Sequence, residues 1–206
     1  MIRIIKNTEP KEWTAYRLTP NAEYKSIPEL RAALLEEQGY ICAYCMRRIP
    51  QKDKNSNEDS RIDHVKCQSG HQDETLNYNN MVICCPGAIN DDFHCDKRKG
   101  ERDISFSPLD PYFISTIKYS SKDGTIKSSN DHFNDEINKV LNLNNKLLKK
   151  NRIEALQGVI SALNKTDWTR GLVDKKIIEW ETKHNGKYYE YCGIVIWFLN
   201  KKKKQL

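Results

Sequence analysis

The sequence of 206 residues contains no apolar stretch long enough to cross a lipid bilayer. Its longest apolar run near the end, residues 194–199, is far too short, and a cluster of lysines at residues 201–204 follows it. The first residues include Arg3, Lys6 and Glu9, where a signal peptide needs an uninterrupted apolar segment. From these absences we expect a cytoplasmic protein with no membrane partner.

A strong excess of charge of one sign is also absent. Lysine and arginine number 34 against 28 aspartates and glutamates, so the net charge is +6. Such an excess suits a phosphate-bearing partner without identifying one. There is no internal repeat and, apart from the lysine tail, no low-complexity segment. The length allows one domain, or a small domain with an extension.

The cysteine content does not fit a disulfide framework, because the number of cysteines, seven, is odd and the expected compartment is reducing. Six of them fall between Cys42 and Cys95, and this clustering indicates a metal site. The seventh, Cys192, lies in an apolar segment and is interpreted as a buried thiol.

Helical and turn signals alternate along the chain. Ser26 and Pro28 are typical of an N-cap and a first turn, and they predict a helix that ends before Gly39. Residues 41–65 are rich in turn formers and contain a polar stretch at residues 51–60, which predicts a β-hairpin or ribbon with a long loop.

The second half of the chain is predicted to be helical. From residue 133 to residue 163, apolar side chains recur at helical spacing, which predicts one long amphipathic helix with a break near Asn144 and Asn145. Two more helices are predicted at residues 172–182 and 188–199. The predicted fold class is therefore α+β, mostly helical, with a small β-containing part around the cysteines.

Cys42 and Cys45 form a Cys-x-x-Cys pair, whose spacing lets two thiolates reach one tetrahedral zinc ion from a tight turn. A second pair is needed to complete the site, and the candidates are Cys84 or Cys85 together with Cys95. The two groups predict a structural zinc site, and the alternative is a set of buried, unliganded thiols.

An acid and an imidazole, Asp63 and His64, lie between the two cysteine groups, and Asn80 follows them. A purely structural zinc module does not need these groups. A phosphodiesterase does: a carboxylate can hold a divalent cation on the scissile phosphate, and a neutral imidazole can take a proton from the attacking water. An amide can then fix the loop or the imidazole.

These residues together resemble the zinc-bearing members of the HNH nuclease family. The family pattern is Cys-x-x-Cys, then Asp/Glu-His, then Asn-Leu followed shortly by a cysteine, then Cys-Asn/Asp-x-x-Lys-Gly. The matching segments are Cys42-Ala43-Tyr44-Cys45, Asp63-His64, Asn80-Met81, Cys85 and Cys95-Asp96-Lys97-Arg98-Lys99-Gly100. The resemblance implies a ββα-metal fold, in which two strands and a helix surround one catalytic cation.

Carried over residue by residue, the resemblance implies that His64 is the general base and that Asp63 is a ligand of a catalytic Mg²⁺ or Mn²⁺ ion. Asn80 would bridge the two strands and steady the histidine loop, and Asp96 would be the second cation ligand. Asp96 departs from the family's usual His or Asn, although a carboxylate is a good ligand for these cations. His94 is its rival for this position.

The family also places its third cysteine after an apolar run and one further residue, which favours Cys85 over Cys84 as a zinc ligand. A closer resemblance covers residues 35–45, which look like the start of the core in PtuB-type HNH proteins, the nuclease subunits of Septu antiphage systems. Those proteins act with an ABC/SMC-like ATPase called PtuA and are also found beside some retrons. The implied partners are nucleic acid, a PtuA-like ATPase and a retron reverse transcriptase with its RNA–DNA hybrid.

The expected organisation is an N-terminal wrap and helix (1–40), a zinc-stabilised ββα-metal HNH nuclease core (41–104) and a helical C-terminal region (105–206) for docking the partner. The expected function is metal-dependent endonucleolytic hydrolysis of nucleic-acid phosphodiester bonds in antiphage defence. The alternative is a non-catalytic, zinc-stabilised nucleic-acid-binding or adaptor module. The sequence does not distinguish DNA from RNA, because phosphate contacts carry no base or sugar identity.

Overall fold

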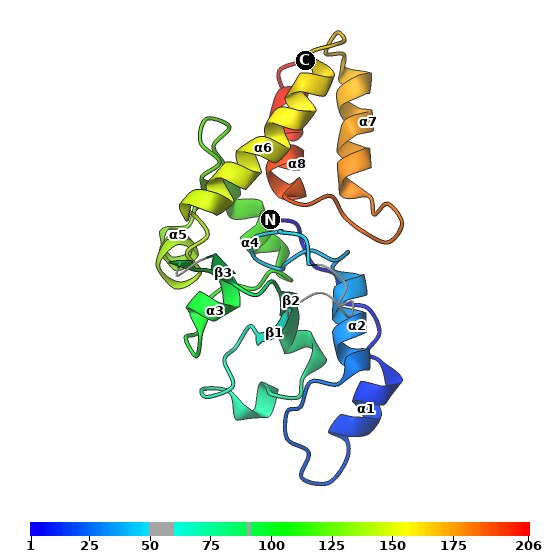
Figure 1. Cartoon of the computed structure of the whole chain (residues 1–206), viewed down its shortest axis with the longest axis vertical. Helices are drawn as coiled ribbons and strands as arrows, with labels where there is room; N and C mark the ends of the chain where they lie inside the picture. Colours follow the sequence, from blue (N-terminus) through cyan, green and yellow to red (C-terminus); the bar gives the residue numbers. More distant parts are fainter. Residues whose placement is uncertain (50–59, 90–91) are drawn as a thin grey trace.

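A computed structural model describes residues 1–49, 60–89 and 92–206. Its strands form small two-stranded sheets, which are combined with helices (Figure 1). The predicted α+β class is therefore confirmed. In chain order the elements are α1 (Lys11–Arg17), α2 (Pro28–Glu37), β1 (Arg61–His64), η1 (Gln72–Glu74), η2 (Tyr78–Asn80), β2 (Met81–Cys84), β3 (Ala88–Ile89), β4 (Asp92–Phe93), α3 (Cys95–Lys99), α4 (Pro111–Thr116), β5 (Ile117–Tyr119), β6 (Ile126–Ser128), α5 (Asp131–Asp135), the π-helical turn η3 (Glu136–Val140), α6 (Lys146–Leu163), α7 (Arg170–Glu181) and α8 (Cys192–Lys203).

Helix α2 packs against strand β2, and α1 packs against α2. Proline at the first position starts α2, but the preceding residue is Ile27, whose side chain cannot cap. The N-cap predicted at Ser26 is therefore wrong, although the helix itself is confirmed and ends at Glu37. Leu30 and Leu34 are fully buried, so this helix covers one side of the small sheet.

Strands β1 and β2 form the small antiparallel sheet that carries the acid and the imidazole. Asp63 lies opposite Val82, and His64 lies opposite Met81. All of β2 is buried, whereas β1 is exposed at its start and buried at its end. The end of β1 that carries Asp63 and His64 therefore lies inside the molecule.

Among the described residues, the hairpin or ribbon predicted over residues 41–65 is not formed between residues 41–49 and β1. Residues 41–49 form a tight turn closed by a bridge between Ile41 and Arg48, and β1 pairs with β2 across a long loop instead. The reason is that β2 is apolar and buried on both faces, so it provides the buried partner for β1. Most of the predicted polar loop at residues 51–60 lies outside the described residues.

A single long helix over residues 133–163 is also wrong, but the predicted break near Asn144 and Asn145 is confirmed. α5 continues into η3, a turn follows, and α6 begins only at Lys146. The side chain of Asn145 accepts a hydrogen bond from the backbone N–H of Leu148, so it caps α6. The side-chain oxygen of Asn144 accepts from the backbone N–H of Ile126, which ties the turn to β6.

The last two predicted helices are present as α7 and α8, but α8 starts at Cys192 rather than at residue 188. Residues 188–191 are hydrogen-bonded to the segment around the first cysteine pair instead of to a helix. Tyr188 donates its backbone N–H to the carbonyl of Gly39, and Tyr191 donates its backbone N–H to the carbonyl of Met46. The C-terminal region, which was expected to be helical, also contains the hairpin β5–β6.

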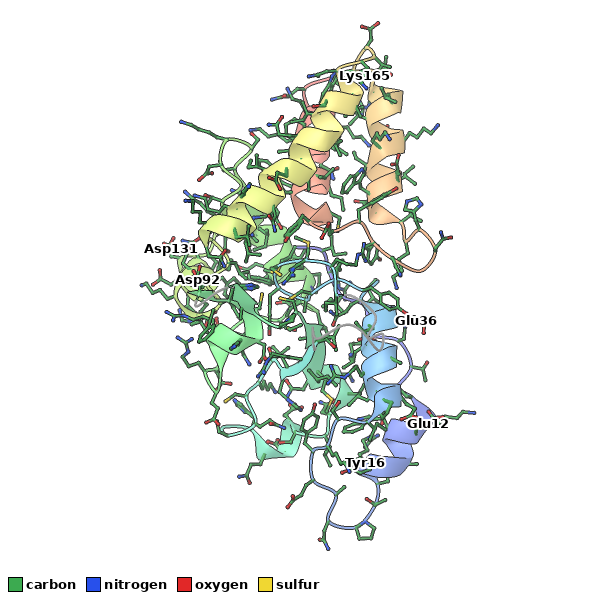
Figure 2. All side chains as sticks on the ribbon, in the orientation of Figure 1. Glu12, Tyr16, Glu36, Asp92, Asp131 and Lys165 are labelled. Carbon is green, nitrogen blue, oxygen red and sulfur yellow. The ribbon has the colours of Figure 1, made fainter. Side chains whose placement is uncertain are left out.

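The helices α6, α7 and α8 gather at one end of the molecule, while α1, α2, β1 and β2 lie toward the other end (Figure 1). In Figure 2, Lys165, just beyond α6, and Tyr16, on α1, mark these two ends. Buried apolar residues form one continuous cluster that includes residues from Met1 to Leu199. Among the described helices, none combines the length and the apolar character that a bilayer span requires.

We predict that two glycines near α6 respond in opposite ways to substitution by alanine. Gly124 has a φ of +73°, and a Cβ there would lie 2.2 Å from the carbonyl oxygen of Lys149. Gly124→Ala should therefore lower the free energy of unfolding by about 2–4 kcal/mol. Gly158 is an exposed residue inside α6, and its Cβ would meet nothing within 4 Å. Gly158→Ala should raise the free energy of unfolding by about 0.5–1 kcal/mol.

Urea denaturation of both variants and of the wild type measures these changes. An unchanged stability in Gly124→Ala would mean that α6 does not lie against the β5–β6 turn as closely as described.

Candidate metal centre and adjoining cleft

Four buried cysteines, Cys42, Cys45, Cys85 and Cys95, place their sulfur atoms within 4.8 Å of one another. Two of the Sγ–Sγ distances are 3.8 Å, between Cys42 and Cys95, and 3.7 Å, between Cys45 and Cys85. Four sulfurs bound to one tetrahedral zinc ion at the usual bond length lie about 3.8 Å apart. The cluster therefore has the donor type and the spacing to bind a metal such as zinc.

Cys42 and Cys45 lie in a tight turn that is held together by its backbone hydrogen bonds. The N–H of Cys42 donates to the carbonyl of Arg47, and the N–H of Met46 donates back to the carbonyl of Cys42. The N–H of Arg47 lies 3.5 Å from the Sγ of Cys45, so it can donate to that sulfur. Met46 has a φ of +62°, which closes the turn and leaves both thiols on the same side.

The other two cysteines come from the end of β2 and the start of α3. Gly87 has a φ of +73°, and a Cβ there would lie 2.5 Å from the carbonyl oxygen of His94. This close approach brings Cys85 and Cys95 together. Cys84, the rival of Cys85 in the sequence, lies within β2 opposite Arg61 and does not belong to the four-sulfur cluster.

Burial raises the pKa of the Cys95 thiol well above its ordinary value, because a thiolate is poorly solvated inside the protein. Its neighbouring sulfurs Cys42, Cys45 and Cys85 shift the pKa in the same direction. A bound zinc ion would supply positive charge next to this sulfur and so favour its thiolate form.

His94, the rival of Asp96 for the last motif position, lies at this cysteine cluster. Its side chain is fully buried, and Nδ1 lies 3.1 Å from the Sγ of Cys95 and 4.0 Å from that of Cys85. Its Nε2 has no hydrogen-bond partner among the described residues. The structure therefore places His94 beside the metal ligands, whereas Asp96 lies in a separate cleft.

This cleft lies next to the cysteine cluster and has a cavity volume of about 230 Å³. Its lining includes the acid–imidazole pair, the second acid and two cations: Asp63, His64, Asp96, Arg61 and Lys99. β1 contributes the first pair and α3 the second acid. Residues that are distant in sequence thus meet in a single cleft.

The carboxylate of Asp63 is held on both oxygens. The Tyr44 hydroxyl donates to Oδ2, and the Lys99 ammonium donates to Oδ1 at 2.9 Å and to the carbonyl of His64 at 2.6 Å. Burial raises the pKa of Asp63; the charge of Lys99 opposes this shift and that of Asp96 adds to it. Two carboxylates therefore lie close enough to repel, an arrangement that positive charge in the cleft relieves.

The orientation of the His64 ring is fixed by a backbone carbonyl. Nε2 lies 2.9 Å from the carbonyl oxygen of Thr75, which can only accept, so Nε2 carries the proton in this hydrogen bond. The Tyr24 ring packs edge-on against the imidazole, with 4.5 Å between ring centroids. Burial lowers the pKa of His64, so the ring is held neutral with its lone pair on Nδ1.

Asn80 fastens the loop that supplies this carbonyl. Its side-chain oxygen accepts from the backbone N–H of Lys66 at 2.8 Å, and its Nδ2 donates to the carbonyls of Lys66 and Glu74. The backbone N–H of Val65 also donates to the carbonyl of Asn80. Asn80 thus connects the chain just beyond His64 with the residue before Thr75.

Asp96, in the first turn of α3, forms an ion pair with Arg61 at the start of β1. The Asp96 side chain is only 9% exposed, whereas that of Arg61 is 50% exposed. The Arg61 side chain can therefore move toward solvent or toward a bound anion without leaving a buried cavity.

Four residues of this site were not expected from the sequence: Tyr44, Thr75, Tyr24 and Arg61. The position of Tyr44 inside the Cys-x-x-Cys pair was a local signal for its role, since a residue there is drawn into the core with the cysteines. Nothing in the sequence identifies Thr75, because it acts through its carbonyl, or Tyr24, because it is brought in by the N-terminal segment.

Comparison with known proteins adds no relative: no protein-family model matches the chain, and no curated protein matches it.

We predict that zinc binding requires Cys85 but does not require the adjacent Cys84. Cys85→Ser should abolish binding of about one zinc ion per chain and lower the melting temperature, because three thiolates leave the tetrahedral site incomplete. Cys84→Ser should retain the zinc. Metal analysis of the purified variants by mass spectrometry measures the content, and zinc loss in Cys84→Ser with retention in Cys85→Ser would reverse the assignment.

Proposed function

We propose that this protein is a metal-dependent endonuclease of the HNH type, in which β1, β2 and α3 form the ββα-metal core. The observation that carries the proposal is the geometry of His64. Its Nε2–H is bound to the Thr75 carbonyl, which leaves the Nδ1 lone pair available in the same cleft as Asp63 and Asp96. A neutral, oriented imidazole beside two carboxylates is the arrangement expected of a general base next to a divalent cation.

His64 takes a proton from the attacking water through Nδ1. The hydrogen bond to Thr75 holds the ring in one tautomer, and it also stabilises the imidazolium that forms. The burial that lowers the pKa of His64 keeps the ring unprotonated before reaction, so that it can act as a base. Asn80 acts indirectly, since it holds the loop from which the Thr75 carbonyl projects.

Asp63 and Asp96 would hold a Mg²⁺ or Mn²⁺ ion, which would stabilise the charge that develops on the phosphate and on the leaving oxygen. Among residues 1–49, 60–89 and 92–206, the four cysteines are the only group of three or more acidic, histidine or cysteine ligands that converges, so the protein would offer this cation two carboxylates without a third such ligand. Two protein carboxylates suit Mg²⁺, because this ion keeps several water and phosphate ligands. Tyr44 and Lys99 orient the Asp63 carboxylate toward the cleft.

Positive charge around the cleft suits a nucleic-acid backbone. Arg61 is half exposed at the cleft, and the exposed Lys97, Arg98 and Arg102 lie on or just after α3. Such side chains contact phosphate oxygens without reading sequence. The substrate can therefore be DNA or RNA. On the resemblance to PtuB-type proteins, we further propose a PtuA-like ABC/SMC-type ATPase as the partner that restrains or targets the nuclease in antiphage defence.

A non-catalytic, zinc-stabilised nucleic-acid-binding module is the second candidate. It is favoured by the internal ion pairs of both carboxylates, Asp63 with Lys99 and Asp96 with Arg61, since a purely structural role would also explain these pairs. The loss of His64 distinguishes the two functions, because a binding module does not need its lone pair.

We predict that His64→Ala lowers the rate of nucleic-acid cleavage by about 10²-fold or more, because the general base is lost. His132→Ala is the matched control, since the His132 side chain is 71% exposed on α5. Cleavage of plasmid DNA, single-stranded DNA and total RNA is measured with Mg²⁺, Mn²⁺ or EDTA, for the chain alone and after co-expression with a PtuA-type ATPase.

Zinc content should be the same in both variants, and cutting should need the added divalent cation. If His64→Ala cuts as fast as the wild type, the catalytic assignment is wrong. If the wild type binds these nucleic acids but cuts none under any condition, the endonuclease function is wrong and the binding-module function is supported.

A further inference from the structure

Arg152, on α6, is a fully buried arginine that pairs with no carboxylate among the described residues. Its Nε donates to the carbonyl of Gly124 at 2.6 Å, and Nη2 donates to the carbonyl of Leu143 at 2.6 Å and to Oδ1 of Asn144 at 3.3 Å. Its Nη1 has no partner in the described part of the chain. A buried cation is strongly unfavourable unless negative charge lies nearby.

Hydrogen bonds and short chain segments connect Arg152 and its neighbour Asn151 with the cysteine cluster. Arg152 binds the carbonyl of Leu143, two residues after Leu141, whose carbonyl accepts the backbone N–H of Cys95. On the other side, the neighbouring Asn151 donates to the Tyr191 hydroxyl. The backbone N–H of Tyr191 donates to the carbonyl of Met46, the residue after Cys45, so α6 is connected with the chain segments of both Cys45 and Cys95.

The electrostatics agree with this placement. Burial lowers the pKa of Arg152, and the acidic groups that oppose this shift include Tyr119, Cys45 and Cys95. Two of these groups are cysteines of the four-sulfur cluster.

A zinc ion bound by four thiolates carries a net charge of about −2, because each thiolate contributes one negative charge. All four cysteines are buried, so water does not solvate this charge. His94 is also buried beside this centre, with its Nδ1 3.1 Å from the Sγ of Cys95. The centre and Arg152 are therefore two buried charges of opposite sign in the same part of the core.

We propose that Arg152 is the counter-cation of the four-cysteine zinc centre, so that zinc retention and the docking of α6 onto the core stabilise each other. Arg152 is a positioning residue in this arrangement and does not ligate the metal. The proposal goes beyond the nuclease function and does not depend on it. By linkage, bound zinc favours the docked position of α6 by the same factor by which the docked position of α6 favours zinc binding.

The test compares zinc binding in Arg152→Gln, which removes the charge, with Arg152→Lys, which keeps it. Zinc affinity is measured by competition with a chelator, and zinc release by transfer to the dye 4-(2-pyridylazo)resorcinol. Arg152→Gln should lower zinc affinity by about tenfold and speed release, as other outer-shell substitutions do. Arg152→Lys should lie closer to the wild type.

Two control variants separate charge from general destabilisation. Leu156→Ala creates a cavity under α6 without a change of charge, and Lys150→Gln removes an exposed cation from the same helix. Both should keep wild-type zinc affinity, although Leu156→Ala lowers the melting temperature. The proposal is overturned if Arg152→Gln retains wild-type affinity, if Arg152→Lys and Arg152→Gln bind zinc equally weakly, or if Leu156→Ala weakens zinc binding as much as Arg152→Gln does.

If Arg152→Gln does not fold, the wild-type protein supplies the test. Removal of zinc with a chelator should then increase amide hydrogen exchange in the part of α6 around Arg152, residues 146–156. Unchanged exchange in this segment after zinc removal would overturn the proposal.

Discussion

The convergence of four cysteine sulfurs at one point is the constraint on which the rest of the molecule depends. Two come from the turn after α2, the third follows β2, and the fourth begins α3. Packing buried thiols side by side gains little unless a cation lies among them, since each buried thiol resists ionisation on its own. A metal at this point would fix the small sheet, α2 and α3 relative to one another.

Two of the chain segments that carry the cysteines, the Cys42–Cys45 turn and the helix α3 that begins at Cys95, also hold the side chains of the cleft. Tyr44 lies inside the first cysteine pair, and its hydroxyl donates to Asp63; Lys99, about one helical turn after Cys95, reaches the same carboxylate and the carbonyl of His64. A displacement of either segment would therefore move Asp63 or His64. A metal bound by these cysteines would therefore influence the geometry of the cleft.

The sequence was sufficient to predict the metal-binding cysteines and the helices, because these follow from residue type and spacing. It was insufficient for features that depend on contacts between distant parts of the chain. The cysteine set and the helices α2, α7 and α8 follow from spacing and periodicity. The choice of Cys85 over Cys84 was open in the residues themselves, because adjacent positions on a strand differ only in the face to which they point. The hairpin β5–β6 and the role of the Thr75 carbonyl depend on partners far along the chain, which local propensity does not reveal.

The C-terminal region is joined to the metal centre by more than apolar packing. The carbonyl of Leu141 receives the N–H of Cys95, and that of Met46 receives the N–H of Tyr191, so both cysteine segments are hydrogen-bonded to this region. Arg152 adds charge between these two contacts. If a partner protein moved α6, it would disturb the backbone of both segments at once, and through Tyr44 and Lys99 the disturbance would reach Asp63. A displacement of α6 would therefore reach the cleft through the hydrogen bonds that join both cysteine segments to the C-terminal region.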